Sequence, residues 1–137
     1  RLALELGIRA HIEFKGQIAS AEMPALLSHA DVFVSTSPSD GNNISLCEAM
    51  ACGAFPVATD IAANRDWVTA GRNGLLFPRG DYQALAKCIA DALRRPEWRE
   101  ELISFNYDVI RERASWDSNM AVMANEYAKL SRRFSNC

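Results

Sequence analysis

The sequence predicts an α/β fold in which helices cover both faces of an open parallel sheet. Short apolar stretches alternate along the chain with segments of helical periodicity. Gly, Pro, Ser and Asn gather in the loops between them. The 137 residues contain no internal repeat and no long linker, and this length is about that of one domain. We therefore expect a single domain over residues 1–137.

Four segments have the pattern of short strands. Residues 12–15 alternate in polarity and end at Gly16, and residues 32–34 form an apolar run. Residues 55–59 and 74–77 are the other two apolar segments. Runs of this kind are typical of strands that are buried on both faces, which favours parallel pairing.

Helices are expected before, between and after these strands. A stretch with Leu2, Leu4 and Leu6 favours a short helix that ends near Gly7. The further helices are predicted over residues 21–29, 45–52, 64–68 (a single turn), from 82 onward, 97–113 and 116–133. The expected N-terminal caps and first-turn prolines are Ser20, Asp81, Ser115, Pro24 and Pro96. We expect the apolar stripes of the last three helices to lie in the core; they include Leu85, Ile89, Ala92, Leu93, Trp98, Trp116 and Tyr127.

The composition of the chain argues against several classes of function. The chain has 17 acidic residues against 15 Lys and Arg, a net charge of −2, whereas a nucleic-acid-binding module normally carries a basic surface. No apolar run approaches the roughly 18 residues that span a bilayer. The cysteines, Cys47, Cys52, Cys88 and Cys137, form no CxxC pair, so we expect no metal site, reduced thiols and a cytoplasmic location.

The loop over residues 35–43 is the strongest candidate site. It follows an expected strand and leads into the helix N-terminus near Ile44 and Ser45, and parallel sheets bind ligands at the carboxyl ends of their strands. Unpaired N–H groups and the helix dipole favour anions there. Gly41 would allow close backbone approach. The segment is therefore interpreted as a cradle for a diphosphate.

Two acids flank this junction, and each has two interpretations. Asp40 and Glu48 could accept hydrogen bonds from sugar hydroxyls, as the acid after a dinucleotide fingerprint does for ribose. Alternatively, Ser45 and Glu48 match a capping box, and Asp40 with Gly41 forms a plain turn. Both interpretations stay open from spacing alone.

Two other segments are weaker candidates. Lys15 and Gly16 border the same cleft or form a simple turn at a strand end. Residues 64–67 include Arg65 and Trp67. They either bind a ligand or form a solvated turn in which Trp67 packs inward.

Five separated blocks together resemble a known family. They are residues 30–34, 37–41, 46–53, 56–59 and 71–77. In order and spacing they resemble the C-terminal, donor-binding domain of family 4 retaining glycosyltransferases of the GT-B fold, over about residues 2–130. The resemblance implies a Rossmann-like open parallel sheet that lacks its first strands here.

The resemblance also assigns roles to residues. Asp40 takes the place of a catalytic acid, usually Glu, that contacts the donor sugar, and Glu48 stands where the family binds the nucleotide ribose. The segment for the sugar and diphosphate is Gly41, Asn42, Asn43, Ile44 and Ser45, where the family usually has a Gly-Phe-Gly-Leu-like sequence. Lys15 and Gly16 resemble the turn beside the nucleotide base. Lys15 and Arg65 are the basic residues expected near the cleft.

The implied function is transfer of a sugar from a UDP- or GDP-linked donor with retention of configuration, without a metal or another cofactor. The family's basic pair and acceptor domain precede the region matched here, so the chain is expected to be an N-terminally truncated part of a two-domain enzyme, inactive alone. Peripheral association of the whole enzyme with a membrane is an open alternative to a purely cytoplasmic one. A different class remains possible, namely a non-catalytic Rossmann-like module that binds a nucleotide or a partner protein.

Overall fold

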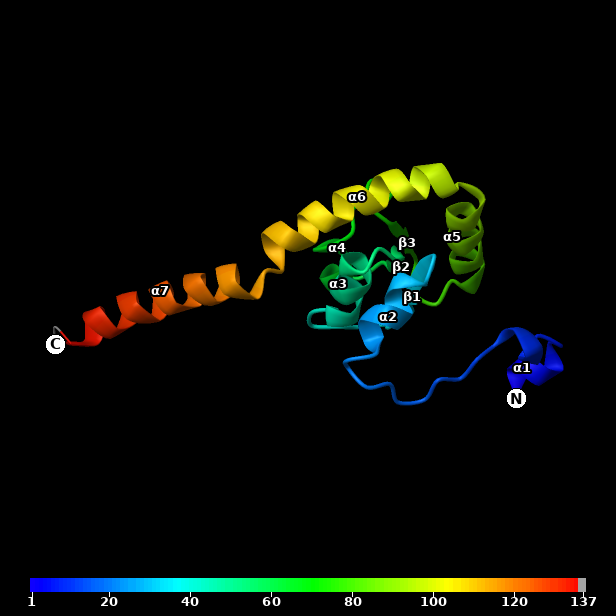
Figure 1. Ribbon diagram of the computed structural model, residues 1–137, viewed down its shortest axis with the longest axis horizontal. Helices are drawn as coiled ribbons and strands as arrows, with labels where there is room; N and C mark the ends of the chain where they lie inside the picture. The colour runs from blue at the N-terminus through cyan, green and yellow to red at the C-terminus, as the bar shows by residue number, and fades with distance from the viewer. Residues whose placement is uncertain (136–137) are drawn as a thin grey trace.

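The computed structural model describes residues 1–135, with side chains over residues 1–132, so Cys137 lies outside the described residues (Figure 1). Its centre is a sheet of three parallel strands in the order β1-β2-β3: β1 Val32–Ser35, β2 Phe55–Thr59 and β3 Leu75–Phe77. Val34 lies opposite Val57, and Val57 opposite Leu75. The predicted parallel sheet is confirmed, and three of the four expected strands form within one residue of their predicted bounds.

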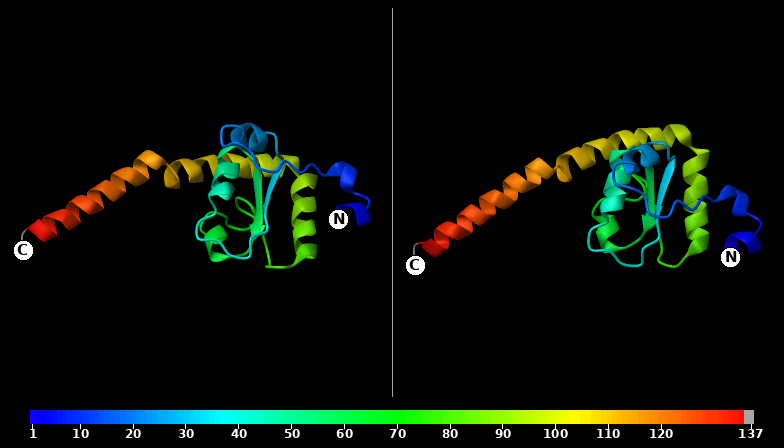
Figure 2. Two further views of the ribbon diagram at one scale, coloured as in Figure 1. Left: turned by 90° about the horizontal axis from the view of Figure 1, so that it is seen from below. Right: turned by 60° about the horizontal axis from the view of Figure 1, so that its bottom comes forward.

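Helices cover both faces of the sheet, as predicted (Figure 2). On one face, Leu46 and Met50 of α3 (Ile44–Ala51) pack against Ala58. On the other, Ala92 of α5 (Tyr82–Arg94) packs with Phe55. Every residue of β2 is buried because both faces of this central strand are covered.

Three further helices complete the body. α2 (Met23–Ser28) packs beside α3 through Leu27 and Ala49. α4 (Ala62–Arg65) follows β2. α6 (Pro96–Arg113) contributes to the cores on both faces, with Trp98 beside the Phe55 ring at a centroid distance of 5.4 Å and Ile110 beside the α3 cluster. The prediction that Trp98 belongs to the core is confirmed.

The prediction of a strand over residues 12–15 is wrong. Ile12 has an extended backbone (φ −121°, ψ 126°), but this segment pairs with no strand among the described residues. It lies away from the sheet, together with α1 (Leu2–Glu5) and the 3-10 helix η1 (Arg9–His11) (Figure 1). Alternating polarity permits a strand, but a strand needs a neighbour to supply its hydrogen bonds.

Several helix boundaries differ from prediction. Glu22, not Ser20, precedes α2, and it makes no side-chain cap. The helical turn expected at 64–68 begins earlier, at Ala62. Asp81 and Ser115 do cap: the Asp81 carboxylate accepts from the Ala84 N–H at 2.8 Å, and the Ser115 hydroxyl from the Ser118 N–H at 3.4 Å.

α7 (Trp116–Ser135) projects away from the body (Figure 1). The expectation that its apolar stripe lies in the core is wrong, since Trp116 is 75% exposed and Tyr127 65%. Leu93, at 51%, is likewise exposed on α5. An amphipathic pattern shows that a helix can bury one face, but it does not show against what. Within residues 1–135, no helix is both long and apolar enough to cross a membrane.

Candidate functional site

The candidate site lies at the carboxyl ends of β1 and β2, where the loop over residues 36–43 leads into α3. Asn43 is the N-cap of α3, because its side-chain oxygen accepts from the Leu46 N–H at 3.1 Å. Ser45 is therefore the second residue of the helix, and Glu48 lies in the second turn. The capping-box interpretation of Ser45 and Glu48 is wrong, and the Glu48 carboxylate makes no hydrogen bond or ion pair among the described side chains.

A buried polar network fixes this loop to the sheet. The Asn43 amide nitrogen donates to Asn64 Oδ1 at 2.9 Å and to Ser35 Oγ at 3.0 Å. The Asn64 amide nitrogen donates to the Thr59 carbonyl at 2.8 Å, and the Thr59 hydroxyl donates to the Ser35 carbonyl at 3.2 Å. Asn43, Asn64 and Thr59 are almost completely buried. The Asn43 side chain thus serves the scaffold, whereas its backbone N–H makes no hydrogen bond within the described residues.

The start of α3 presents the features predicted for an anion site. The Ser45 N–H, like that of Asn43, donates no hydrogen bond within residues 1–135. Ile44 is 63% exposed, and the Ser45 residue is exposed beside it. Unpaired N–H groups at the positive end of a helix dipole suit an oxyanion.

Asp40 and Gly41 form an exposed turn beside this helix start. Asp40 Oδ1 accepts from the Asn42 N–H at 3.1 Å, which stabilises the turn, and Asp40 stays exposed, so a role toward a ligand stays a prediction. Gly41 has no positive φ, and a Cβ atom added there would meet nothing within 4 Å. The backbone does not require glycine here, but the space beside Gly41 is open.

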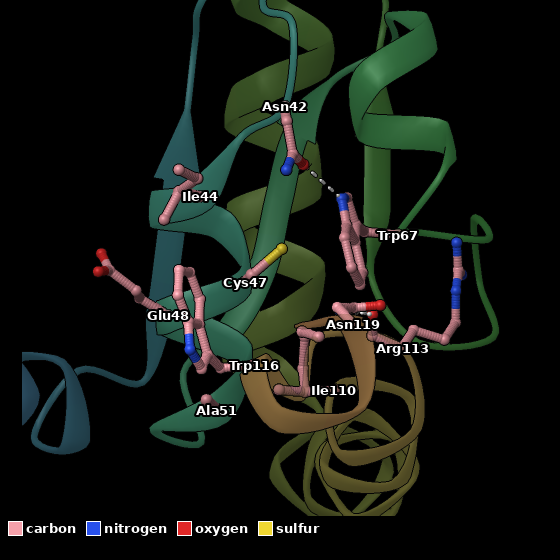
Figure 3. Close-up of a pocket in the computed structure, with 11 residues that line it drawn as sticks. Asn42, Ile44, Cys47, Glu48, Ala51, Trp67, Ile110, Arg113, Trp116 and Asn119 are labelled. Carbon is pink, nitrogen blue, oxygen red and sulfur yellow. Dashed lines mark hydrogen bonds between the residues drawn. The ribbon is translucent and has the colours of Figure 1, made fainter. Parts of the chain in front are cut away.

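A cavity of about 610 Å³ runs along the outer side of α3 (Figure 3). Its walls come from α3, from the segment after α4, and from the joint between α6 and α7. The residues that line it are Asn42, Ile44, Cys47, Glu48, Ala51, Trp67, Ile110, Arg113, Ala114, Trp116 and Asn119. The structure thus brings Asn42, Ile44 and Glu48 to one cavity, together with residues that sequence reasoning left out.

Arg113 is the main residue that sequence reasoning missed. Its guanidinium carbon lies 4.9 Å from the centre of the Trp67 ring, and Trp67 Nε1 donates to Asn42 Oδ1 at 3.1 Å. No local sequence pattern could have identified Arg113, because it ends a helix that is distant in the chain from the loop. Trp67 is half-buried and packs against the core around Leu46, which agrees with the inward-packed interpretation.

Burial or pairing fixes the charge state of other titratable groups in this region. Burial raises the pKa of the Cys47 thiol to about 11, against a smaller opposing influence of Arg113, so this thiol is neutral at pH 7. Arg65 Nε lies 2.6 Å from Asp60 Oδ1, and the hydrogen bond from Arg65 lowers the pKa of Asp60. Arg65 is thus paired on α4. Among the described side chains, no three of His, Cys, Asp or Glu gather as metal ligands.

Lys15 and Gly16 lie apart from this cavity. Lys15 pairs with Glu13 at 2.6 Å and borders a smaller hollow with Gln17, Ile18, Glu22 and Leu26. Gly16 has φ +64°, a left-handed conformation that favours glycine in a turn. The structure does not bring these two residues beside Glu48, and their role at a nucleotide base stays a prediction.

Comparison with known proteins agrees with this arrangement. A sequence model described as glycosyl transferases group 1 matches residues 1–109. The chain belongs to this family. It is 36% identical over 113 residues to the phosphatidyl-myo-inositol mannosyltransferase of Mycobacterium leprae, which covers 80% of this chain and 29% of that protein. It is 34% identical over 96 residues to the putative glycosyltransferase EpsD of Bacillus subtilis, a match that covers 70% of this chain and 25% of that protein.

Solved glycosyltransferase structures share the fold. A sucrose-phosphate synthase from Thermosynechococcus elongatus superposes with a TM-score of 0.92 at 27% identity, over 96% of this chain and 33% of that one. Anabaena HepE in complex with UDP gives 0.88 at 23% identity, over 93% of this chain and 35% of that one, and so supports the fold alone. The resemblance to a glycosyltransferase C-terminal domain is confirmed. This family member spans about a quarter to a third of the length of these relatives.

Proposed function

We propose that this chain is the donor-binding part of a retaining glycosyltransferase, with a nucleotide-sugar as its substrate. The observation that carries the proposal is the cap of α3. Because Asn43 caps the helix, Glu48 is free of the capping role that would otherwise explain it. Glu48 lines the cavity, and its carboxylate has no partner among the described side chains and points outward, away from Trp67 and Arg113 (Figure 3). Family membership supplies the reaction class.

Each group at the site has a distinct task in this proposal. The Glu48 carboxylate accepts hydrogen bonds from the ribose hydroxyls, and Asp40 those of the donor sugar. The backbone of residues 41–45, with the unpaired N–H groups of Asn43 and Ser45, receives the diphosphate. As the bond from the sugar to the diphosphate breaks, negative charge grows on the leaving oxygen, and fixed N–H dipoles stabilise that charge without reorganising. The anomeric configuration is retained.

The rest of the enzyme completes the reaction in this proposal. The acceptor site, the cations for the diphosphate and the first strands of the sheet come from a part of the protein outside this chain, so the isolated chain transfers no sugar. The base is uracil or guanine, since relatives include a mycobacterial enzyme named as GDP-mannose-dependent and HepE in complex with UDP-glucose. A cytoplasmic location, with or without peripheral contact to a membrane, belongs to the same proposal.

Titration of the chain with UDP, GDP and ADP tests the donor site. Glu48→Gln should weaken binding of the preferred nucleotide about tenfold or more, as expected for loss of a charged hydrogen-bond acceptor, with little change in the unfolding midpoint. Glu101→Gln is the matched control, because it removes the same charge from an exposed position of α6 that does not line the cavity.

Three results would contradict the proposal, each at a different point. A Glu48→Gln variant that unfolds more readily yet binds nucleotide unchanged would restore a structural role for Glu48. Sugar transfer by the isolated chain would refute the proposal that the acceptor site and the diphosphate cations lie in another part of the enzyme. Nucleotide binding by a complete protein that transfers no sugar would favour the non-catalytic module instead.

A further inference from the structure

We infer that Trp67 is a positioning residue, which turns the Asn42 side chain so that its amide N–H groups face the donor substrate. This inference rests on the proposed function, because the ligand it concerns is the nucleotide-sugar. It assigns to Trp67 and Arg113 a role that neither residue type suggests by itself.

The direction of the Asn42 amide follows from its partner. Trp67 Nε1 lies 3.1 Å from Asn42 Oδ1, and an indole N–H can only donate. The amide oxygen must therefore face Trp67, and the amide nitrogen must face away. Figure 3 shows this nitrogen on the side of Asn42 remote from Trp67. It donates no hydrogen bond to any described residue.

Trp67 itself is held from two sides. Its carbonyl accepts from the amide nitrogen of buried Asn73 at 2.8 Å, which fixes the backbone. Its ring lies beneath the Arg113 guanidinium at 4.9 Å, a cation–π arrangement. The backbone of Arg113 is fixed at the helix joint, where its main-chain carbonyl accepts from the Asn119 side-chain amide nitrogen at 3.1 Å. An ordered ring offers its N–H in one direction.

The exposed end of the amide suits the chemistry of the donor. Phosphate oxygens are acceptors, so an amide nitrogen attracts them, whereas a reversed amide would present its oxygen and repel them. The unpaired N–H groups of Asn43 and Ser45 follow directly in the chain. Asn42 thus adds a side-chain donor to a set of backbone donors, and Trp67 determines that it is a donor.

The test separates the indole N–H from the aromatic ring. Trp67→Phe keeps the ring and the stacking surface but removes the donor. Trp98→Phe is the matched control: Arg95 lies over the Trp98 ring at 6.0 Å, yet the Trp98 indole N–H donates to no described residue, and Trp98 packs on the opposite face of the sheet. UDP-glucose and GDP-mannose serve as probes, with dissociation constants measured by calorimetry on the complete protein that contains this chain, unaltered and with each substitution.

Substitutions of Trp67 and Asn42 should have coupled effects on the dissociation constant. Trp67→Phe and Asn42→Ala should each weaken binding about two- to tenfold, the range expected for one neutral hydrogen bond. The double variant should bind no more weakly than Asn42→Ala alone, since Trp67 acts through Asn42. Without ligand, Asn42→Ala should shift the Trp67 indole N–H resonance and leave that of Trp98 in place.

Each contrary outcome has a distinct meaning. Binding by Trp67→Phe equal to that of the unaltered protein, or additive losses in the double variant, would overturn the positioning role while the proposed function stands. An unmoved Trp67 resonance in Asn42→Ala would overturn the hydrogen bond on which the inference depends. Failure of the complete protein to bind either nucleotide-sugar would overturn the proposed function and this role with it.

Discussion

The Asn43 amide nitrogen donates to Asn64 Oδ1 at 2.9 Å, and this bond joins the first residue before α3 to the short helix α4 across the carboxyl ends of the strands. The same Asn43 side chain caps α3 through its oxygen. One side chain therefore decides where α3 begins, and with it which groups of the candidate site remain unpaired.

Replacement of Asn43 should lower the free energy of unfolding, because its buried side chain both caps α3 and donates into the polar network. Asn43→Ala removes the cap and leaves Asn64 Oδ1 without its donor in a buried position, so the free energy of unfolding should fall by about 1–3 kcal/mol. Urea unfolding measures this. The control is Asn125→Ala, an exposed substitution on α7 at a side chain with no hydrogen bond to a described residue, which should change stability by less than about 0.5 kcal/mol. Equal effects of the two variants would show that the buried network contributes nothing.

Two glycines should respond differently to the same added methyl group. A Cβ atom at Gly74 would lie 2.8 Å from the Pro56 carbonyl oxygen and 2.9 Å from a Val68 methyl carbon, so Gly74→Ala should cost about 1–3 kcal/mol. At Gly41 the space is open and φ is not positive, so Gly41→Ala should leave the unfolding free energy unchanged or raise it by up to about 1 kcal/mol. Thermal unfolding compares them. A tolerated Gly74→Ala would mean that β2 and β3 can separate locally.

Two ion pairs that involve arginines of α6 should contribute differently to the free energy of unfolding. Arg99 is only 11% exposed; it lies 2.6 Å from Asp31 and also donates to the Ala92 carbonyl at 3.2 Å, so Arg99→Ala should destabilise by about 1–3 kcal/mol. Arg111 pairs with Asp108 at 2.7 Å but is 76% exposed, and Arg111→Ala should change stability by less than about 0.5 kcal/mol. Both variants remove one cation from the same helix. A larger loss in Arg111→Ala would reverse this order.

The Cys47 thiol should be slow to react. Burial raises its pKa from 9.0 to about 11, so at pH 8 the folded chain should be alkylated by iodoacetamide about 100-fold more slowly than the chain unfolded in urea. The other cysteines are first replaced by serine. Because the unfolded chain loses this proton at lower pH, the free energy of unfolding should decrease as pH rises from about 9 toward 11. Similar alkylation rates in the folded and unfolded chain would contradict the burial.

The sequence predicted those elements whose determinants are local. Residues 55–59 form a buried strand because an uninterrupted apolar run can only be accommodated inside, and Asp81 and Ser115 cap because their bonds reach three residues along the chain. The strand over 12–15 failed because pairing depends on a neighbour. For the cap of α3, both Asn43 and Ser45 are good cap residues, and distant partners, Ser35 and Asn64, decide between them.

The candidate site could be predicted mainly along one segment of the chain. Asp40, Asn42 and Glu48 were identifiable because they adjoin one strand end and one helix start, and the family blocks include that region. Trp67 could be named only as a weaker candidate in a separate segment, and Arg113 was missed, because only the packing of α6 across α3 brings both to the same cavity. No periodicity relates residues from such separate elements.

The angle at the joint between α6 and α7 determines where the far end of α7 lies. A helix of 20 residues is about 30 Å long, so a tilt of 10° at Ala114 and Ser115 would carry its far end through about 5 Å. Trp116 and Asn119 lie within the first turn after that joint and would hardly move. A change of this angle would therefore alter the cavity wall that Trp116 and Asn119 form much less than it would displace the exposed apolar residues farther along α7.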